Sequence, residues 1–72
     1  MKQTDHDDIS TGEKVFYRYS KTNGAPIGPF TVQGFYRNHE GKHVTLRNHD
    51  GEDRTVLLAT DEDFGAPLFY TP

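Results

Sequence analysis

Alternation of apolar and polar positions is the main structural signal in this chain of 72 residues. Residues 15–19 and 30–37 are rich in aromatic and β-branched side chains, and residues 43–47 alternate strictly between apolar and polar. Such period-two patterns are typical of half-buried strands. Residues 54–59 contain an apolar run of four, which predicts a strand buried on both sides. Residues 68–70 lie between two prolines and predict a closing edge strand.

The segment between the second and fourth predicted strands contains the same turn sequence twice. Residues 37–41 and 47–51 both read Arg-Asn-His-acid-Gly. An acidic residue followed by glycine between two alternating segments predicts a β-hairpin, because glycine supplies the positive φ that the turn needs. We therefore expect a three-stranded meander in which each loop has three residues and ends on Gly41 or Gly51.

This register decides which side chains face the core. It places Tyr36 opposite Val44, and Val44 opposite Val56, as a buried apolar row across three strands. On the outer face it forms two favourable pairs, Arg47–Asp53 and Thr45–Thr55. Among the other aromatic residues, Tyr17 and Phe30 point inward in this register, whereas Phe16 and Phe35 point outward.

The remaining segments predict connections and a tail. Residues 20–29 form a long first loop, and Gly34 predicts a bulge or a sharp bend within the second strand. Residues 60–65 read as one short helical turn that Thr60 caps and Gly65 ends, with Phe64 at the barrel end. Residues 1–11 are acidic and contain one aliphatic residue, so they predict a mobile N-terminal tail beside a single small domain, residues 12–72.

Five short strands, a long first loop and a helical turn before the last strand follow one another in this order. Residues 12–17 read Gly-Glu-Lys-Val-Phe-Tyr and residues 28–32 read Gly-Pro-Phe-Thr-Val. These motifs are similar to the starts of strands one and two in SH3-like small β-barrels of the Tudor, KOW and retroviral-integrase C-terminal type. The resemblance covers most of residues 12–70. It implies an all-β, five-stranded SH3-like barrel and points to no single family.

Catalytic motifs are missing from the sequence. The chain has no cysteine, which excludes a disulfide framework and a thiol nucleophile. Its two serines lie outside any nucleophile motif, and it has no phosphate-binding glycine-rich loop. We expect a protein without catalytic residues or a cofactor. The enzymatic alternative is an oligomeric small barrel that resembles plasmid-type dihydrofolate reductase, although Val32-Gln33-Gly34-Phe35 matches only the start of that family's Val-Gln-Ile-Tyr run.

The four histidines raise the question of a metal site. His39 and His49 occupy equivalent turns at opposite ends of strand 43–47, on the order of 17 Å apart, so they cannot share an ion. His39 and His43 flank one turn and form at most a weak site with Glu40. We expect solvated turn histidines and no bound metal.

The sequence also bears on location. No apolar stretch approaches the roughly 20 residues that a membrane-spanning helix needs. The first residues are polar and acidic, unlike a secretory signal peptide. We therefore expect a cytoplasmic protein that does not associate with membranes.

Charge is distributed unevenly along the chain, although its net value is only −3. Residues 14–49 contain six basic residues and one acidic residue, and residues 50–72 contain one basic and six acidic residues. Two interpretations account for this pattern. Opposite charges on adjacent strands neutralise each other across the sheet, or the basic residues form a face that binds nucleic acid.

Aromatic residues exceed what a small core can bury, so some of them are candidates for a contact surface. We expect a small accessory or regulatory protein that binds a protein partner through Phe16, Arg18, Tyr19, Phe35 and Arg37. A homodimer contact explains the same surplus. The alternative is a nucleic-acid-binding module that uses Lys14, Lys21, Lys42 and Arg47.

Overall fold

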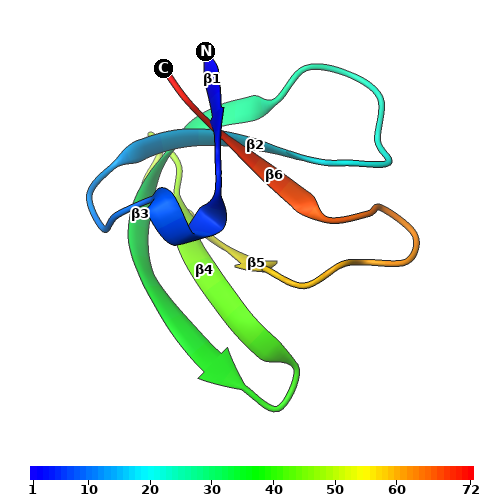
Figure 1. Cartoon of the computed structure of the whole chain (residues 1–72). Coiled ribbons are helices and arrows are strands. Elements are labelled where there is room, and N and C mark those ends of the chain that lie inside the picture. Colours follow the sequence, from blue (N-terminus) through cyan, green and yellow to red (C-terminus); the bar gives the residue numbers. More distant parts are fainter.

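Six strands and one short 3-10 helix make up the computed structural model, which describes residues 1–72. The strands are β1 (Lys2–Thr4), β2 (Lys14–Tyr19), β3 (Ile27–Asn38), β4 (Gly41–Arg47), β5 (Asp53–Leu57) and β6 (Pro67–Thr71), and helix η1 (His6–Asp8) follows β1. All six strands form one antiparallel sheet, as Figure 1 shows. The predicted all-β class is confirmed. The chain contains no helix that is long and apolar enough to cross a membrane.

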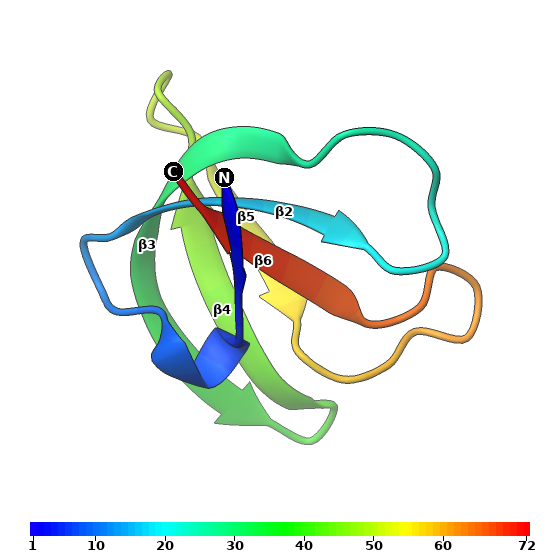
Figure 2. The ribbon, with the colours of Figure 1, turned by 45° about the horizontal axis from the view of Figure 1, so that its top comes forward.

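The sheet curls around the core but is not closed. Its strand order is β1-β6-β2-β3-β4-β5, so β1 and β5 are the two edges (Figure 2). The five-stranded barrel is therefore not confirmed, and the structure has a six-stranded sheet in its place. The five predicted strands appear as β2 to β6, and the predicted long loop between the first two covers residues 20–26.

One face of the curled sheet carries the core. Period-two alternation sends every second side chain of each strand to this face. The nine buried apolar residues are Ile9, Val15, Tyr17, Phe30, Val32, Val44, Leu46, Val56 and Phe69. Tyr17 and Phe30 thus point inward as predicted, and Phe16 lies on the opposite face of β2.

The predicted register of the second hairpin is confirmed. Val44 pairs with Val56, Thr45 with Thr55 and Arg47 with Asp53. The predicted irregularity near Gly34 is also present, because the register between β3 and β4 shifts between Val32 and Gly34. This shift leaves one extra residue in β3, as in a β-bulge.

The predicted register of the first hairpin is wrong by one residue. Phe35 pairs with Val44, and Tyr36 pairs with His43, so Phe35 lies on the core side and Tyr36 on the outer side. Tyr36 is 44% exposed and therefore is not part of the buried row. A shift of one residue moves each side chain to the other face of the sheet, which is why the two aromatic residues exchange places.

The two turns differ because their asparagines form different hydrogen bonds. In the first turn, Asn38 Oδ1 accepts a hydrogen bond from Glu40 N, and the pairing of Asn38 with Gly41 leaves a loop of two residues. In the second turn, Asn48 Oδ1 accepts hydrogen bonds from Asp50 N and also from Glu52 N. The second loop therefore retains the three residues that its sequence predicts.

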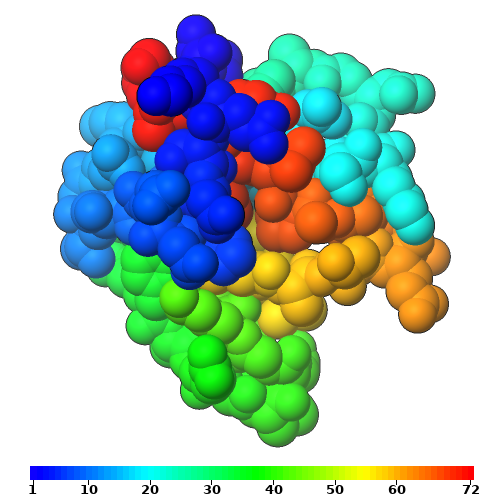
Figure 3. Space-filling model, viewed as in Figure 1, coloured from blue at the N-terminus to red at the C-terminus, as the bar shows by residue number.

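The N-terminal segment is part of the sheet, which differs from the tail that its composition predicts. Residues 2–4 pair with residues 69–71 of β6, and Ile9 is only 5% exposed. Figure 3 shows this segment in dark blue, spread over the molecule between β6 and the β3–β4 hairpin. Backbone pairing and one buried side chain thus outweigh the polar composition of residues 1–11.

The segment before β6 forms a tight turn, so the predicted helical turn is wrong. Asp61 and Gly65 pair through their backbones, and Asp61 Oδ1 accepts hydrogen bonds from Asp63 N and Phe64 N. Asp61 therefore takes the capping role predicted for Thr60. Phe64 is 50% exposed and does not fill the end of the sheet.

Candidate functional site

The loop of residues 20–26 is held beside the turn of residues 61–65. Ser20 N donates to Ala66 O, and Lys21 N donates to Phe64 O, both at 2.8 Å. Ala66 N donates in return to Ser20 Oγ at 3.0 Å. Figure 1 shows the two connections side by side, in cyan and orange. These bonds fix the start of the loop and with it one wall of a surface hollow.

Aromatic rings form the floor of this region. The rings of Tyr17 and Tyr19 meet edge to face, with centroids 5.9 Å apart. Tyr17 also contacts the rings of Phe30 and Phe69, at 5.6 and 6.2 Å. Such pairs stabilise a cluster beyond the area that they bury. The partial burial of Tyr19 raises the pKa of its phenol above the ordinary value of 10.0.

Arg54 reaches this cluster from β5, across the open side of the sheet. Its Nη1 donates a hydrogen bond to Tyr17 Oη at 3.1 Å, and its guanidinium lies 5.5 Å from the centre of the Phe30 ring. The hydrogen bond to Tyr17 is the main cause of a raised pKa for Arg54, which keeps its positive charge. The guanidinium is thus held by two aromatic residues, and its other N–H groups remain able to bind an anion.

These elements surround a hollow of about 300 Å³. It is lined by Tyr17, Arg18, Tyr19, Thr22, Asn23, Ala25, Ile27 and Arg54. A second hollow of about 210 Å³ shares Ile27 and Arg54 with the first. Ile27 is 47% exposed, so an apolar side chain and a fixed positive charge border both hollows. This combination suits a ligand that carries an apolar group next to an anionic one.

The residues predicted to bind a protein partner lie at three separate places. Arg18 and Tyr19 line the larger hollow, where Arg18 Nη1 donates to Thr22 O at 3.2 Å. Phe16 lies on the outer face of β2. Phe35 and Arg37 lie on the β3–β4 hairpin, which projects from the body of the molecule in Figure 1. The structure thus brings together only part of the predicted set.

The residues predicted to bind nucleic acid are also separated. Lys14 and Arg47 lie in one row across the sheet, because Thr31 pairs with both of them. Arg47 forms an ion pair with Asp53, and Lys42 lies 3.7 Å from an Asp7 carboxylate oxygen. Lys21 lies in the loop, where its Nζ donates to Glu62 O at 2.7 Å.

The Arg47–Asp53 pair leads to a pH-dependent prediction. Arg47 donates to Asp53 from Nε at 2.7 Å and from Nη2 at 3.2 Å, and these bonds hold the pKa of Asp53 below its usual value of 3.8. Because the folded-state pKa is the lower one, the pair stabilises the fold above that usual value. The contribution is lost as the pH falls through the folded-state pKa. It is small, since both side chains are exposed.

We expect Arg47→Gln to raise the pKa of Asp53, as followed by NMR titration of its side-chain carboxyl carbon. Arg37→Gln is the matched control, because Arg37 holds the same position in the other turn sequence. This control should leave the Asp53 titration unchanged. An Asp53 curve that is identical in Arg47→Gln and in the unaltered protein would contradict the assignment.

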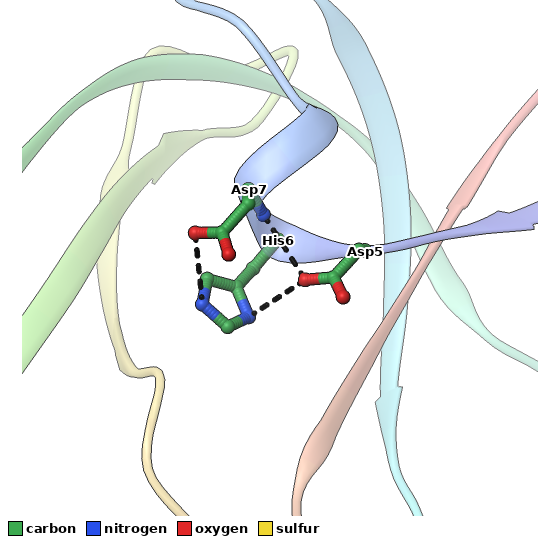
Figure 4. Close-up of side chains that lie close together, drawn as sticks. All are labelled: Asp5, His6 and Asp7. Carbon is green, nitrogen blue, oxygen red and sulfur yellow. Dashed lines mark hydrogen bonds and ion pairs between the residues drawn. The ribbon is translucent and has the colours of Figure 1, made fainter.

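A third cluster lies at η1, where Figure 4 shows Asp5, His6 and Asp7 close together. His6 Nδ1 lies 3.2 Å from Asp5 Oδ1, and His6 Nε2 lies 3.3 Å from Asp7 Oδ1. The three residues offer ligand atoms within 4.8 Å of one another. The two carboxylates, however, face opposite nitrogens of a single imidazole ring. An ion bound at one nitrogen is turned away from the carboxylate at the other, so we assign this cluster to local side-chain contacts at an exposed turn.

The hollow next to η1 is the largest, at about 350 Å³. It is lined by Gln3, Thr4, Asp5, His6, Pro67 and Leu68. Leu68 is its main apolar contribution. It therefore offers less apolar contact to a ligand than the hollow beside Arg54.

Ile27 and Arg54 line both hollows, but the sequence alone did not identify them as candidate binding residues. Arg54 is the only basic residue among residues 50–72, and the confirmed register of β5 places it opposite buried Leu46. This register could have identified Arg54 from the sequence, because an arginine on the core side of a strand must reach a polar partner or an open end of the sheet. Ile27 offers no such signal, since its exposure depends on the path of the preceding loop.

Comparison with protein-family models, with curated proteins and with solved structures found no match.

Proposed function

We propose that this chain is a non-enzymatic protein-interaction module that binds a short segment of a partner protein in the hollow beside Arg54. The observation that carries the proposal is the convergence of two tyrosine rings, exposed Ile27 and the fixed guanidinium of Arg54 around one concave surface. Tyrosine and arginine are among the residues enriched where single side chains dominate the energy of protein contacts.

The partner segment contributes an apolar side chain and a neighbouring carboxylate. The apolar side chain packs between Ile27 and the tyrosine rings, which line the same hollow. The carboxylate takes the free N–H groups of Arg54, whose planar fork matches a carboxylate in geometry. Because Tyr17 already holds this guanidinium, little conformational entropy is lost when it binds.

We also propose that the fold is an open SH3-like barrel. What supports this is the chain order of β2 to β6, with the long loop after β2 and a tight turn before β6. In the sheet, β6 lies beside β2, so the last strand returns to the first of these five. The strand β1 is then an addition to the edge of this five-stranded unit.

A peptide-display selection on the full chain tests the proposed function. We expect the selected peptides to combine apolar and acidic residues and to lose about tenfold or more in affinity when Ile27 is replaced by aspartate. Ile27 is exposed, so this variant should fold normally. Phe35→Ser is the control on the projecting hairpin and should bind as the unaltered protein does.

The salt dependence of binding separates this function from the nucleic-acid alternative, which the row of Lys14 and Arg47 favours. If the chain is retained on single-stranded DNA, and this retention falls steeply between about 50 and 200 mM salt, the result would support that alternative. It would also count against the peptide site. Peptide binding that survives Ile27→Asp and is lost in Phe35→Ser would also refute the proposed site.

A further inference from the structure

His43 is the buried polar residue of this structure, and its surroundings differ from those of a solvated turn histidine. It lies on β4, on the outer side of the sheet, and is only 6% exposed. Its ring stacks on the ring of Tyr36, with centroids 4.9 Å apart and an angle of 5° between the planes. Burial and stacking together fix the orientation of this imidazole.

The hydrogen bonding of His43 decides which nitrogen carries the proton. Nδ1 lies 3.0 Å from Gly41 O. A carbonyl oxygen only accepts, so Nδ1 must be the donor and the lone pair of the neutral ring is on Nε2. Nε2 makes no hydrogen bond, and its nearest charged neighbour is Glu40 Oε2 at 3.9 Å. Metal-binding histidines show this same arrangement, in which the second ring nitrogen donates to a carbonyl or carboxylate.

Glu40 places its carboxylate between two histidines. Its Oε2 faces His43 Nε2 at 3.9 Å, and its Oε1 lies 3.7 Å from His39 Nε2. Two donor atoms that each bind a tetrahedral zinc ion at about 2.1 Å lie about 3.4 Å apart. These two separations exceed this value by a few tenths of an ångström. The two imidazoles face different oxygens of the carboxylate, and the three donor atoms do not lie within 4.8 Å of one another, so His39 must move toward His43 to share an ion. The side chains of His39 and Glu40 are 87% and 60% exposed, so they are free to close around an ion that His43 holds.

We propose that the tip of the β3–β4 hairpin binds a zinc-type divalent cation through His39 Nε2, the Glu40 carboxylate and His43 Nε2, with water in the remaining position. Two imidazoles and a carboxylate form a donor set that this class of ion accepts. The nearby cations Arg37 and Lys42 are cross-strand neighbours in the register of β3 and β4, and their side chains lie on the opposite face of the hairpin from His43. This site is independent of the proposed peptide hollow.

The repeated turn supplies an internal control. His49 and Asp50 match His39 and Glu40, and they also lie near each other, with His49 Nε2 3.3 Å from Asp50 Oδ1. The residue that corresponds to His43, however, is Asp53, which is occupied by Arg47. The second turn therefore lacks the buried imidazole, and we expect it to contribute nothing to the binding of the ion.

Titration of zinc ions alone into the full chain tests the proposal, with calorimetry for the affinity and NMR for the ring signals of each histidine. We expect one ion per chain and a shift of the His43 ring signals. His39→Ala and Glu40→Gln should each weaken binding about tenfold or more, whereas His49→Ala should bind zinc unchanged. Thermal unfolding without zinc checks that the variants are folded, and both altered side chains are exposed.

Three results would each overturn the proposal. The first is the absence of any zinc-dependent heat or ring shift. The second is an affinity in His39→Ala and Glu40→Gln equal to that of the unaltered protein. The third is zinc binding that disappears in the double variant Asp5→Asn, Asp7→Asn, because the ion would then lie at η1. Replacement of zinc by cobalt adds a check, since its visible absorption reports the coordination number.

Discussion

Replacing Gly65 with alanine is expected to destabilise the fold by about 2–6 kcal/mol, whereas the same change at Gly51 is expected to cost about 1–3 kcal/mol. Both glycines have a left-handed backbone, with φ of +84° at Gly65 and +86° at Gly51. The conformational cost of a side chain is therefore the same at the two positions.

The difference between the two positions is steric. A Cβ on Gly51 would meet no atom within 4 Å. A Cβ on Gly65 would overlap Ser20 Oγ and come within 2.9 Å of the backbone nitrogen of Lys21. These are the groups that bond the loop of residues 20–26 to the turn before β6, so the clash must displace one wall of the hollow.

Urea unfolding of the two variants measures this difference. A domain of this size has a total stability of about 4–11 kcal/mol, so Gly65→Ala is expected to lower the midpoint severely or to unfold the protein. Equal midpoints for Gly65→Ala and Gly51→Ala would show that the two connections are not packed together as described. Where Gly65→Ala does not fold, Ser20→Ala removes the hydrogen bond from Ala66 N with a smaller loss.

Ile9→Ala is expected to destabilise the fold by about 2–4 kcal/mol. Ile9 is 5% exposed and belongs to the single apolar core, although the surrounding residues are polar and acidic. Truncation to alanine leaves a cavity that a small core cannot readily refill. Ile27→Ala is the matched control, because Ile27 is 47% exposed and should change the stability by less than about 0.5 kcal/mol.

Thermal unfolding compares these two isoleucine variants directly. For a domain of this length, each kcal/mol corresponds to about 4–8 °C in Tm, so a loss at Ile9 is readily seen. An Ile9→Ala variant with the Tm of Ile27→Ala would restore the interpretation of residues 1–11 as a tail outside the domain.

Much of the sheet can be predicted from the sequence, because its strands alternate and its turns contain acid-glycine pairs. The second hairpin is correct to the residue, since its three-residue loop is the one that aligns Val44 with Val56 and Arg47 with Asp53. The first hairpin has the same turn sequence but a shorter loop. Two turns that differ only in Glu40 and Asp50 therefore have different loop lengths, and the hydrogen bond from Glu52 N to Asn48 Oδ1 is the local difference.

The candidate sites were less accessible to prediction for two physical reasons. The peptide hollow depends on Arg54 reaching Tyr17 across the open side of the sheet, and no local pattern encodes a contact between residues so far apart in the chain. The hairpin site depends on the one-residue register that places His43 beside Tyr36. With the predicted register, that imidazole has no stacking partner and reads as a solvated turn residue.

The position of β6 in the sheet also affects how the chain can assemble during synthesis. β6 is the last strand to be made, yet it lies between β1 and β2, which are the first two. The meander from β2 to β5 has neighbouring partners throughout and is able to pair while translation proceeds, because contacts near in sequence form fastest. The first strand has no partner until β6 emerges. Residues 2–4 therefore join the sheet only after the four strands between them and β6 have been synthesised.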